Sequence, residues 1–153
     1  MAKFKFRLAS LLSIKEKMEQ LKKNEYAEAL AIVNKLLLKK TELLEEIERN
    51  LNIWQNQLQN GAKPNEIIQY NHYVELVKVN VKKTEEEIIN AQEMAEKKRL
   101  LLVEAMKERK MLENLKEKDY NEFRIEETKE EQKFLDEIAS YKTAGGEQDG
   151  DGS

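Results

Sequence analysis

The 153-residue chain contains no cysteine, one proline, one histidine and five glycines. The absence of cysteine excludes a disulfide scaffold, a thiol nucleophile and a zinc site built from thiolates. Four of the five glycines fall within residues 145–153, so the rest of the chain lacks the turn residues that a globular α/β enzyme of this length needs. Most catalytic and metal-binding sites that use histidine combine it with a second histidine, a cysteine or a positioned carboxylate, and the presence of a single histidine argues against such sites. The sequence therefore predicts no enzyme, and no catalytic, cofactor or metal site.

Long apolar runs and a strong excess of one charge are also absent. No run approaches the roughly 20 apolar residues that cross a bilayer, and no signal-peptide pattern precedes a small-residue cleavage site. The formal net charge of −3 and the pI near 5.5 argue against a protein that wraps nucleic acid. We therefore expect a soluble, cytosolic protein with no nucleic-acid partner and no transmembrane segment.

Residues that favour helices, mainly Glu, Lys, Leu, Ala and Gln, fill the body of the chain. One interruption stands at residues 60–65, where Gly61 suits the left-handed end of one helix and Pro64 suits the first turn of the next. The sequence predicts a helix over about residues 6–59, a turn over 60–64, a second helix over about 64–141, and a disordered tail over 143–153.

Apolar residues in both predicted helices recur at intervals of three and four, which is the pattern of a heptad seam. In the first helix the seam is predicted at Tyr26, Leu30, Val33, Leu37, Lys40, Leu44, Ile47, Leu51, Trp54 and Leu58. In the second it is predicted at Ile67, Tyr70, Val74, Val77, Val81, Thr84, Ile88, Ala91, Ala95, Lys98, Leu102, Ala105, Arg109 and Leu112. Two seams joined by a short turn predict an all-α fold, an antiparallel coiled-coil hairpin over residues 1–142.

One flank of this predicted seam is apolar near the turn. With Leu37 and Val74 taken as heptad position a, the g positions of this flank include Leu36, Leu43 and Tyr73. Such a patch has two interpretations. The side chains either widen the seam or form a partner-binding surface, because contiguous exposed apolar patches usually mark interfaces.

The second helix is longer than the first, so with residue i facing about residue 122 − i, residues 117–141 extend as an unpaired arm beside the N-terminus. Residues 1–23 carry seven Lys or Arg against two Glu, whereas residues 113–140 carry ten Asp or Glu against five Lys or Arg. Opposite charges therefore gather where the termini meet, although exposed pairs are worth only about 0–1 kcal/mol each.

Other polar groups fit ordinary helix surfaces. His72 has no second histidine or carboxylate cluster beside it, and adjacent glutamates such as Glu85 and Glu86 point in different directions on a helix. The basic amphipathic start of the chain suggests a membrane surface or a transit peptide. Glu16 and Glu19 follow it at once, so protein contact is favoured over lipid contact.

Three segments carry a resemblance to the flagellar FliJ family. They are FKFRLASLL at residues 4–12, EAMKERKMLENL at residues 104–115, and EEQ with DEIA at residues 130–139. The turn at residues 60–61 and the Tyr70-containing start of the second helix also fit, so the resemblance spans about residues 4–140.

The resemblance implies a component of the bacterial flagellar type III export apparatus. Family members are antiparallel coiled-coil hairpins similar to the coiled coil of the rotary ATPase γ subunit. The resemblance implies two main partners, the hexameric export ATPase and the cytoplasmic domain of the export-gate membrane protein. It also implies a chaperone role, contacts with export chaperones, and a place at the cytoplasmic face of the membrane at the flagellar base.

Candidate contact residues follow from this likeness. For the end that meets the ATPase they are Phe6, Arg7, Leu11, Arg109, Lys110 and Phe123, and for the export gate they are Leu36, Leu43 and Tyr73. Three alternatives stay open: a stalk protein of a virulence type III system, a central-stalk subunit of a rotary ATPase, and an architectural coiled-coil homodimer without an ATPase partner.

Overall fold

The computed structural model describes residues 3–150, with side chains for residues 3–145. Within these residues the chain forms two helices, α1 (Ala9–Gln59) and α2 (Pro64–Gly150), and no strand. Gly61 lies in the turn between them with φ at +86°, which is the left-handed conformation predicted from the sequence. Helix α1 ends at Gln59 and α2 begins at Pro64, the residues at which the sequence predicts these two boundaries.

The outer helix ends differ from the sequence prediction. Helix α1 begins at Ala9 rather than near Phe6, because the backbone first makes a turn in which the Ala9 N–H donates to the Phe6 carbonyl at 3.1 Å. Helix α2 continues to Gly150, beyond the end predicted near residue 141. At Thr143 the hydroxyl donates to the Ala139 carbonyl at 2.8 Å, a bond along the helix. Residues 151–153 of the predicted tail lie outside the described residues.

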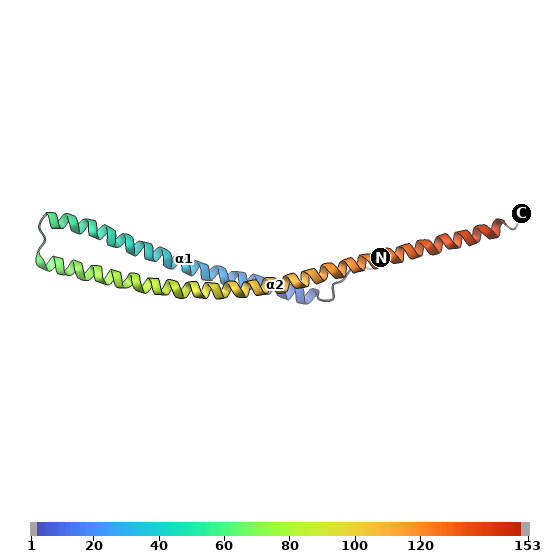
Figure 1. Cartoon of the computed structure of the whole chain (residues 1–153), viewed down its shortest axis with the longest axis horizontal. Helices are drawn as coiled ribbons and strands as arrows, with labels where there is room; N and C mark the ends of the chain where they lie inside the picture. The colour runs from blue at the N-terminus through green and yellow to red at the C-terminus, as the bar shows by residue number, and fades with distance from the viewer. Residues whose placement is uncertain (1–2, 151–153) are drawn as a thin grey trace. The chain divides into compact units, whose positions relative to one another are not determined.

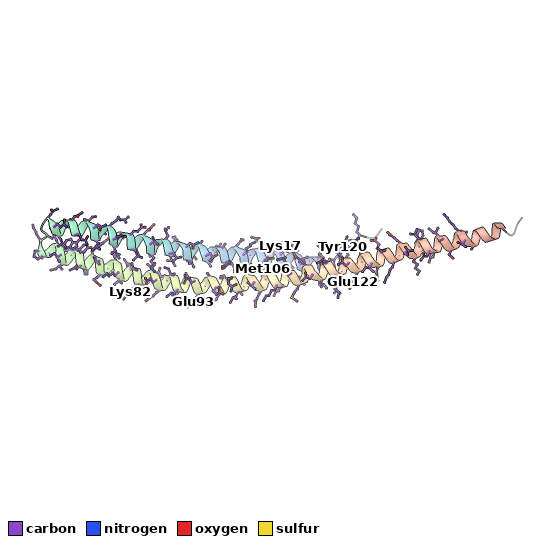
Figure 2. All side chains as sticks on the ribbon, turned by 45° about the horizontal axis from the view of Figure 1, so that its top comes forward. Lys17, Lys82, Glu93, Met106, Tyr120 and Glu122 are labelled. Atoms are coloured by element: carbon purple, nitrogen blue, oxygen red, sulfur yellow. The ribbon has the colours of Figure 1, made fainter. Side chains whose placement is uncertain are left out.

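The chain divides into two compact units. The hairpin unit is Met18–Met106, and the terminal unit combines residues 3–17 with residues 107–150. In the hairpin unit α1 and α2 lie side by side and run in opposite directions, joined by the green turn in Figure 1. Lys82 and Glu93 lie on the side of α2 that faces away from α1 (Figure 2).

The seam predicted for the second helix is confirmed. Its fourteen positions are all buried or half-buried, from Ile67 to Leu112. Within the hairpin unit the most buried include Val77 and Ile88, and Ala95 packs with Ala29 and Val33 of α1 in a small core cluster. The alanines at positions 29 and 95 take up little space where the two helices meet.

The seam predicted for the first helix is half wrong. Its positions at Tyr26, Val33, Lys40, Ile47 and Trp54 are buried or half-buried, but the alternating leucines are exposed. The row that completes the contact with α2 is shifted by one residue, to Ala29, Leu36, Leu43 and Asn50. Leucines stand next to each other at 36–37 and 43–44, so the apolar pattern fits two adjacent faces of α1 equally well.

Polar layers interrupt the apolar contact between the helices. Thr84 is 1% exposed, and its hydroxyl is satisfied by the Asn80 carbonyl at 2.8 Å. Next to it, the Lys40 amine of α1 lies 3.3 Å from the Glu85 carboxylate of α2. Farther from the turn, the Glu25 carboxylate accepts a hydrogen bond from Lys22 at 3.4 Å and forms an ion pair with Lys98 at 3.6 Å. These pairs place residue i of α1 opposite about residue 124 − i of α2, close to the predicted register.

Candidate partner-binding surfaces

Surfaces, rather than enclosed sites, are what the described residues offer. They hold no group of three or more His, Cys, Asp or Glu side chains suited to a metal ion. His72 is exposed on α2. Neither helix, over the residues searched, has a stretch long and apolar enough to cross a membrane.

The N-terminal segment of the terminal unit packs on α2 through aromatic rings. The Phe4 ring meets Tyr120 edge-on with centroids 5.3 Å apart and lies 5.6 Å from the Phe123 ring. Phe6 is 8% exposed, and Leu12 in the first turns of α1 is 5% exposed. The residues before α1 are thus held against α2 without helical hydrogen bonds, an arrangement that the helix-only reading of the sequence missed.

The six residues predicted for the ATPase end all belong to the terminal unit, but they do not form one exposed patch. Phe6 is buried and Phe123 is half-buried by the contact with Phe4, so both contribute to packing within the unit. Arg7, Leu11 and Lys110 are exposed.

Two ion pairs lie along the same unit. The Arg109 guanidinium donates to the Glu113 carboxylate at 2.7 Å, one helical turn away. The Lys15 amine of α1 meets the Glu108 carboxylate of α2 at 2.8 Å. Arg109 keeps only 19% of its side chain exposed, so little of it is open to a partner protein.

Beyond Phe123, α2 presents a series of exposed apolar side chains. They are Ile125, Phe134, Leu135, Ile138 and Tyr141, with exposed fractions of 38–81%. Phe134, Ile138 and Tyr141 follow the four-three spacing that places side chains on one helix face. In the sequence, acidic residues are interspersed among these apolar residues: Glu130, Glu131, Asp136 and Glu137.

The three residues of the flank predicted for the export gate differ in how far they are buried. Leu36 and Leu43 are half-buried against α2, which supports the interpretation that they widen the seam. Tyr73 remains 36% exposed and carries the polar group of this flank. Its hydroxyl donates to the Glu46 carboxylate and accepts from the Asn50 amide at 3.2 Å.

The sequence reading did not single out Glu46 or Asn50. Both lie one helical turn apart on α1, where Asn50 also donates to the Glu46 carbonyl at 2.9 Å. The hydrogen bond to Glu46 raises the pKa of the Tyr73 phenol above its ordinary value of 10.0, and burial and the carboxylate charge add to the shift. The available signal was a tyrosine in the third turn of a helix whose partner helix carries Glu-x-x-x-Asn.

Comparison with known proteins places this geometry in a family. The model of the family described as Flagellar FliJ protein matches residues 4–148. Among solved structures, the chain is similar to a YscO homologue, CT670, from Chlamydia trachomatis, with a TM-score of 0.57 and 18% sequence identity. That likeness covers 95% of this chain and 99% of the other, and at this identity it shows a shared fold.

No curated protein matches the sequence. The family match covers nearly the whole chain, including the N-terminal aromatic segment, the turn and the long second helix, and it agrees with the two-helix hairpin fold. The chain therefore belongs to the Flagellar FliJ protein family.

Proposed function

We propose that this chain is a non-enzymatic coiled-coil component of the bacterial flagellar type III export apparatus, linking the hexameric export ATPase to the export gate. Family membership over residues 4–148 is the observation that carries the proposal. ATP hydrolysis then belongs to the partner, and the chain acts at the cytoplasmic face of the membrane at the flagellar base. Assistance to substrate export, including contacts with export chaperones, completes this role.

Contact with the ATPase is assigned to the terminal unit, together with the exposed apolar face of α2 at Phe134, Ile138 and Tyr141. All three side chains are exposed, Tyr141 to 81%, so packing within the chain does not account for them. Buried apolar anchors are the usual source of interface energy. Arg7, Leu11 and Lys110 supply further exposed groups in this unit.

The test combines Phe134→Ser with Ile138→Ser in the full chain and measures the purified ATPase for assembly and activity. Since both side chains are exposed, helicity and the melting temperature should be unchanged while stimulation of the ATPase is lost. Leu76→Ser, at a side chain 53% exposed on the hairpin unit, is the matched control. Full stimulation by the double variant would place the ATPase contact elsewhere.

Contact with the export gate is assigned to the flank of Leu36, Leu43 and Tyr73, with Tyr73 as its exposed anchor. Calorimetry with the cytoplasmic domain of the gate protein tests this assignment. Tyr73→Ala should weaken binding about thirtyfold, the loss of roughly 2 kcal/mol expected for a central anchor. Lys78→Ala is the control, because Lys78 is exposed on the other flank of α2. Unchanged affinity in Tyr73→Ala would limit this flank to a structural role.

A virulence type III stalk protein is the second candidate, favoured by the shared fold with the YscO homologue. Binding to the flagellar ATPase and to a virulence-system ATPase, measured side by side, separates the two functions. The flagellar proposal requires the flagellar enzyme to be the preferred partner.

A further inference from the structure

Helix α1 carries a second heptad row that remains partly exposed in the hairpin unit. Its members are leucines seven residues apart, and each keeps 39–47% of its surface exposed: Leu30, Leu37, Leu44, Leu51 and Leu58. All of them lie in the hairpin unit. Five leucines at one heptad position form a continuous apolar line, because the row follows the winding of the coiled coil.

Positions midway between the leucines complete a seam. They are Asn34, Thr41, Glu48 and Gln55, all of them exposed. Together with the leucines they give the alternating four-three spacing of a coiled-coil face. The Thr41 hydroxyl already donates to the Leu37 carbonyl at 3.0 Å, so a partner that covers Thr41 leaves this group satisfied. Glu48 is the one charged residue among these nine positions.

The hairpin offers the leucines few apolar partners on α2. On this side of the seam, α2 presents polar residues at its flanking heptad positions, namely Asn71, Lys78, Glu85 and Gln92. Leu30 borders a shallow groove, which is lined from α2 by Gln92, Glu96 and the small apolar residue Ala95. Glu85 is already paired with Lys40. The leucine surface that α2 leaves exposed is therefore available to another helix.

We propose that this second seam binds an amphipathic helix of another protein, which lies along α1 and carries a Lys or Arg opposite Glu48. Residues 30–58 extend over about 42 Å at 1.5 Å per residue, so the partner helix needs about four heptads. The surface is separate from the Tyr73 flank, which lies on the other side of the contact between α1 and α2. The inference therefore goes beyond the contacts in the proposed function.

Charge decides between a foreign helix and a second copy of this chain. A parallel pair of α1 helices in register would place Glu48 against Glu48 of the other copy, which is a like-charge contact. An antiparallel pair centred on the leucine row would pack Glu48 against Leu37. Both arrangements cover a carboxylate without a counter-charge, and such burial is costly. A helix with a cation at that position removes the cost.

The test uses fluorescence anisotropy with the full chain and a labelled synthetic peptide of four heptads. The peptide has leucine and isoleucine in its seam, uncharged flanks and one lysine placed opposite Glu48. Leu37→Gln combined with Leu44→Gln should weaken binding at least thirtyfold. Leu76→Gln, on the outer face of α2, should leave the affinity unchanged.

A charge swap makes the test specific for the proposed partner. Glu48→Lys should weaken binding of the lysine peptide about tenfold, and a peptide with glutamate at that position should restore it. Sedimentation of the wild-type chain should show a monomer. A dimer that dissociates in the Leu37→Gln and Leu44→Gln double variant would overturn the proposal in favour of a second copy.

Two further results would also overturn it. One is undiminished peptide binding by the double leucine variant. The other is a loss of melting temperature in that variant as large as the loss in Val33→Ala, because Val33 is 7% exposed in the core. That outcome would assign the leucine row to the hairpin core.

Discussion

The indole ring of Trp54 stacks on the phenol ring of Tyr70, with centroids 4.5 Å apart and planes inclined by 12°. The two rings come from opposite sides of the turn and close the hairpin unit at that end. Trp54 is 8% exposed. The Tyr70 hydroxyl is buried and has no hydrogen-bond partner among the residues described. Packing and an unsatisfied polar group therefore act in opposite directions at one contact.

Substitutions at this stack should separate the two effects. Trp54→Ala should lower the free energy of unfolding by about 3 kcal/mol, the usual cost of removing a buried large aromatic side chain. Tyr70→Phe should raise it by about 1 kcal/mol, because the variant keeps the ring and removes the unsatisfied hydroxyl. Thermal unfolding followed by circular dichroism measures both. Destabilisation by Tyr70→Phe would mean that the hydroxyl has a partner, such as an ordered water.

Replacing glycine by alanine should destabilise the turn but stabilise the helix. Gly61→Ala should cost about 1–2 kcal/mol, because an alanine Cβ is strained at positive φ even though no atom lies within 4 Å of it. Gly145→Ala places its Cβ in open space on α2 and should increase helicity, since alanine favours a helix by about 1 kcal/mol over glycine. Urea unfolding and helicity at low temperature provide the readouts. Equal effects at both sites would contradict the assigned turn.

Tyr73 should ionise at a higher pH than an ordinary tyrosine. Its hydrogen bond to Glu46 needs the protonated phenol, so the folded pKa lies above the unfolded value of 10.0. The stabilisation is therefore fully present below pH 10 and is lost as the pH rises through the raised folded pKa. The difference in tyrosinate absorbance between the wild-type chain and Tyr73→Phe reports this group. Glu46→Gln should bring the pKa back toward 10, and an unchanged titration would rule out Glu46 as the cause.

Replacing a seam lysine should stabilise the hairpin. Lys98 keeps 34% of its side chain exposed at a seam position, and its contact with Glu25 is worth only about 0–1 kcal/mol. Lys98→Leu should therefore raise stability by about 1 kcal/mol, because the apolar side chain buries more surface against α1. Lys97→Leu, one residue away on an exposed position, is the control and should have no effect on melting. A loss of stability in Lys98→Leu would show that the ion pair is the stronger term.

The fold was largely predictable from the sequence, and α2 was the easiest part. Eleven of its fourteen predicted heptad positions are apolar, among them β-branched or small residues such as Val77 and Ala95. The turn was equally clear, because Gly61 and Pro64 stand alone in the body of the chain. The register of α1 was not predictable from apolar spacing, because Leu36 and Leu37 both satisfy it.

The candidate surfaces were harder to predict. The sequence predicted a helix from residue 6, yet Phe4 anchors a non-helical segment through ring contacts with residues more than a hundred positions away, and Phe6 is buried beside it. Local patterns carry no information about such contacts. The likeness to the FliJ family was stronger than any single pattern, since it rested on the order and spacing of several motifs, and the family is confirmed over residues 4–148.

The polar layers give the hairpin unit a fixed axial alignment. An apolar heptad pattern by itself repeats every seven residues, so it tolerates a slide of about 10 Å between two helices. Such a slide would bring Lys40 to Lys78 or Gln92 in place of Glu85, and Glu25 to Ala91 or Ala105 in place of Lys98. Each alternative alignment loses both ion pairs, so the polar layers favour one axial alignment of the two helices. A partner protein that contacts both helices of the hairpin unit therefore finds their side chains at fixed positions relative to one another.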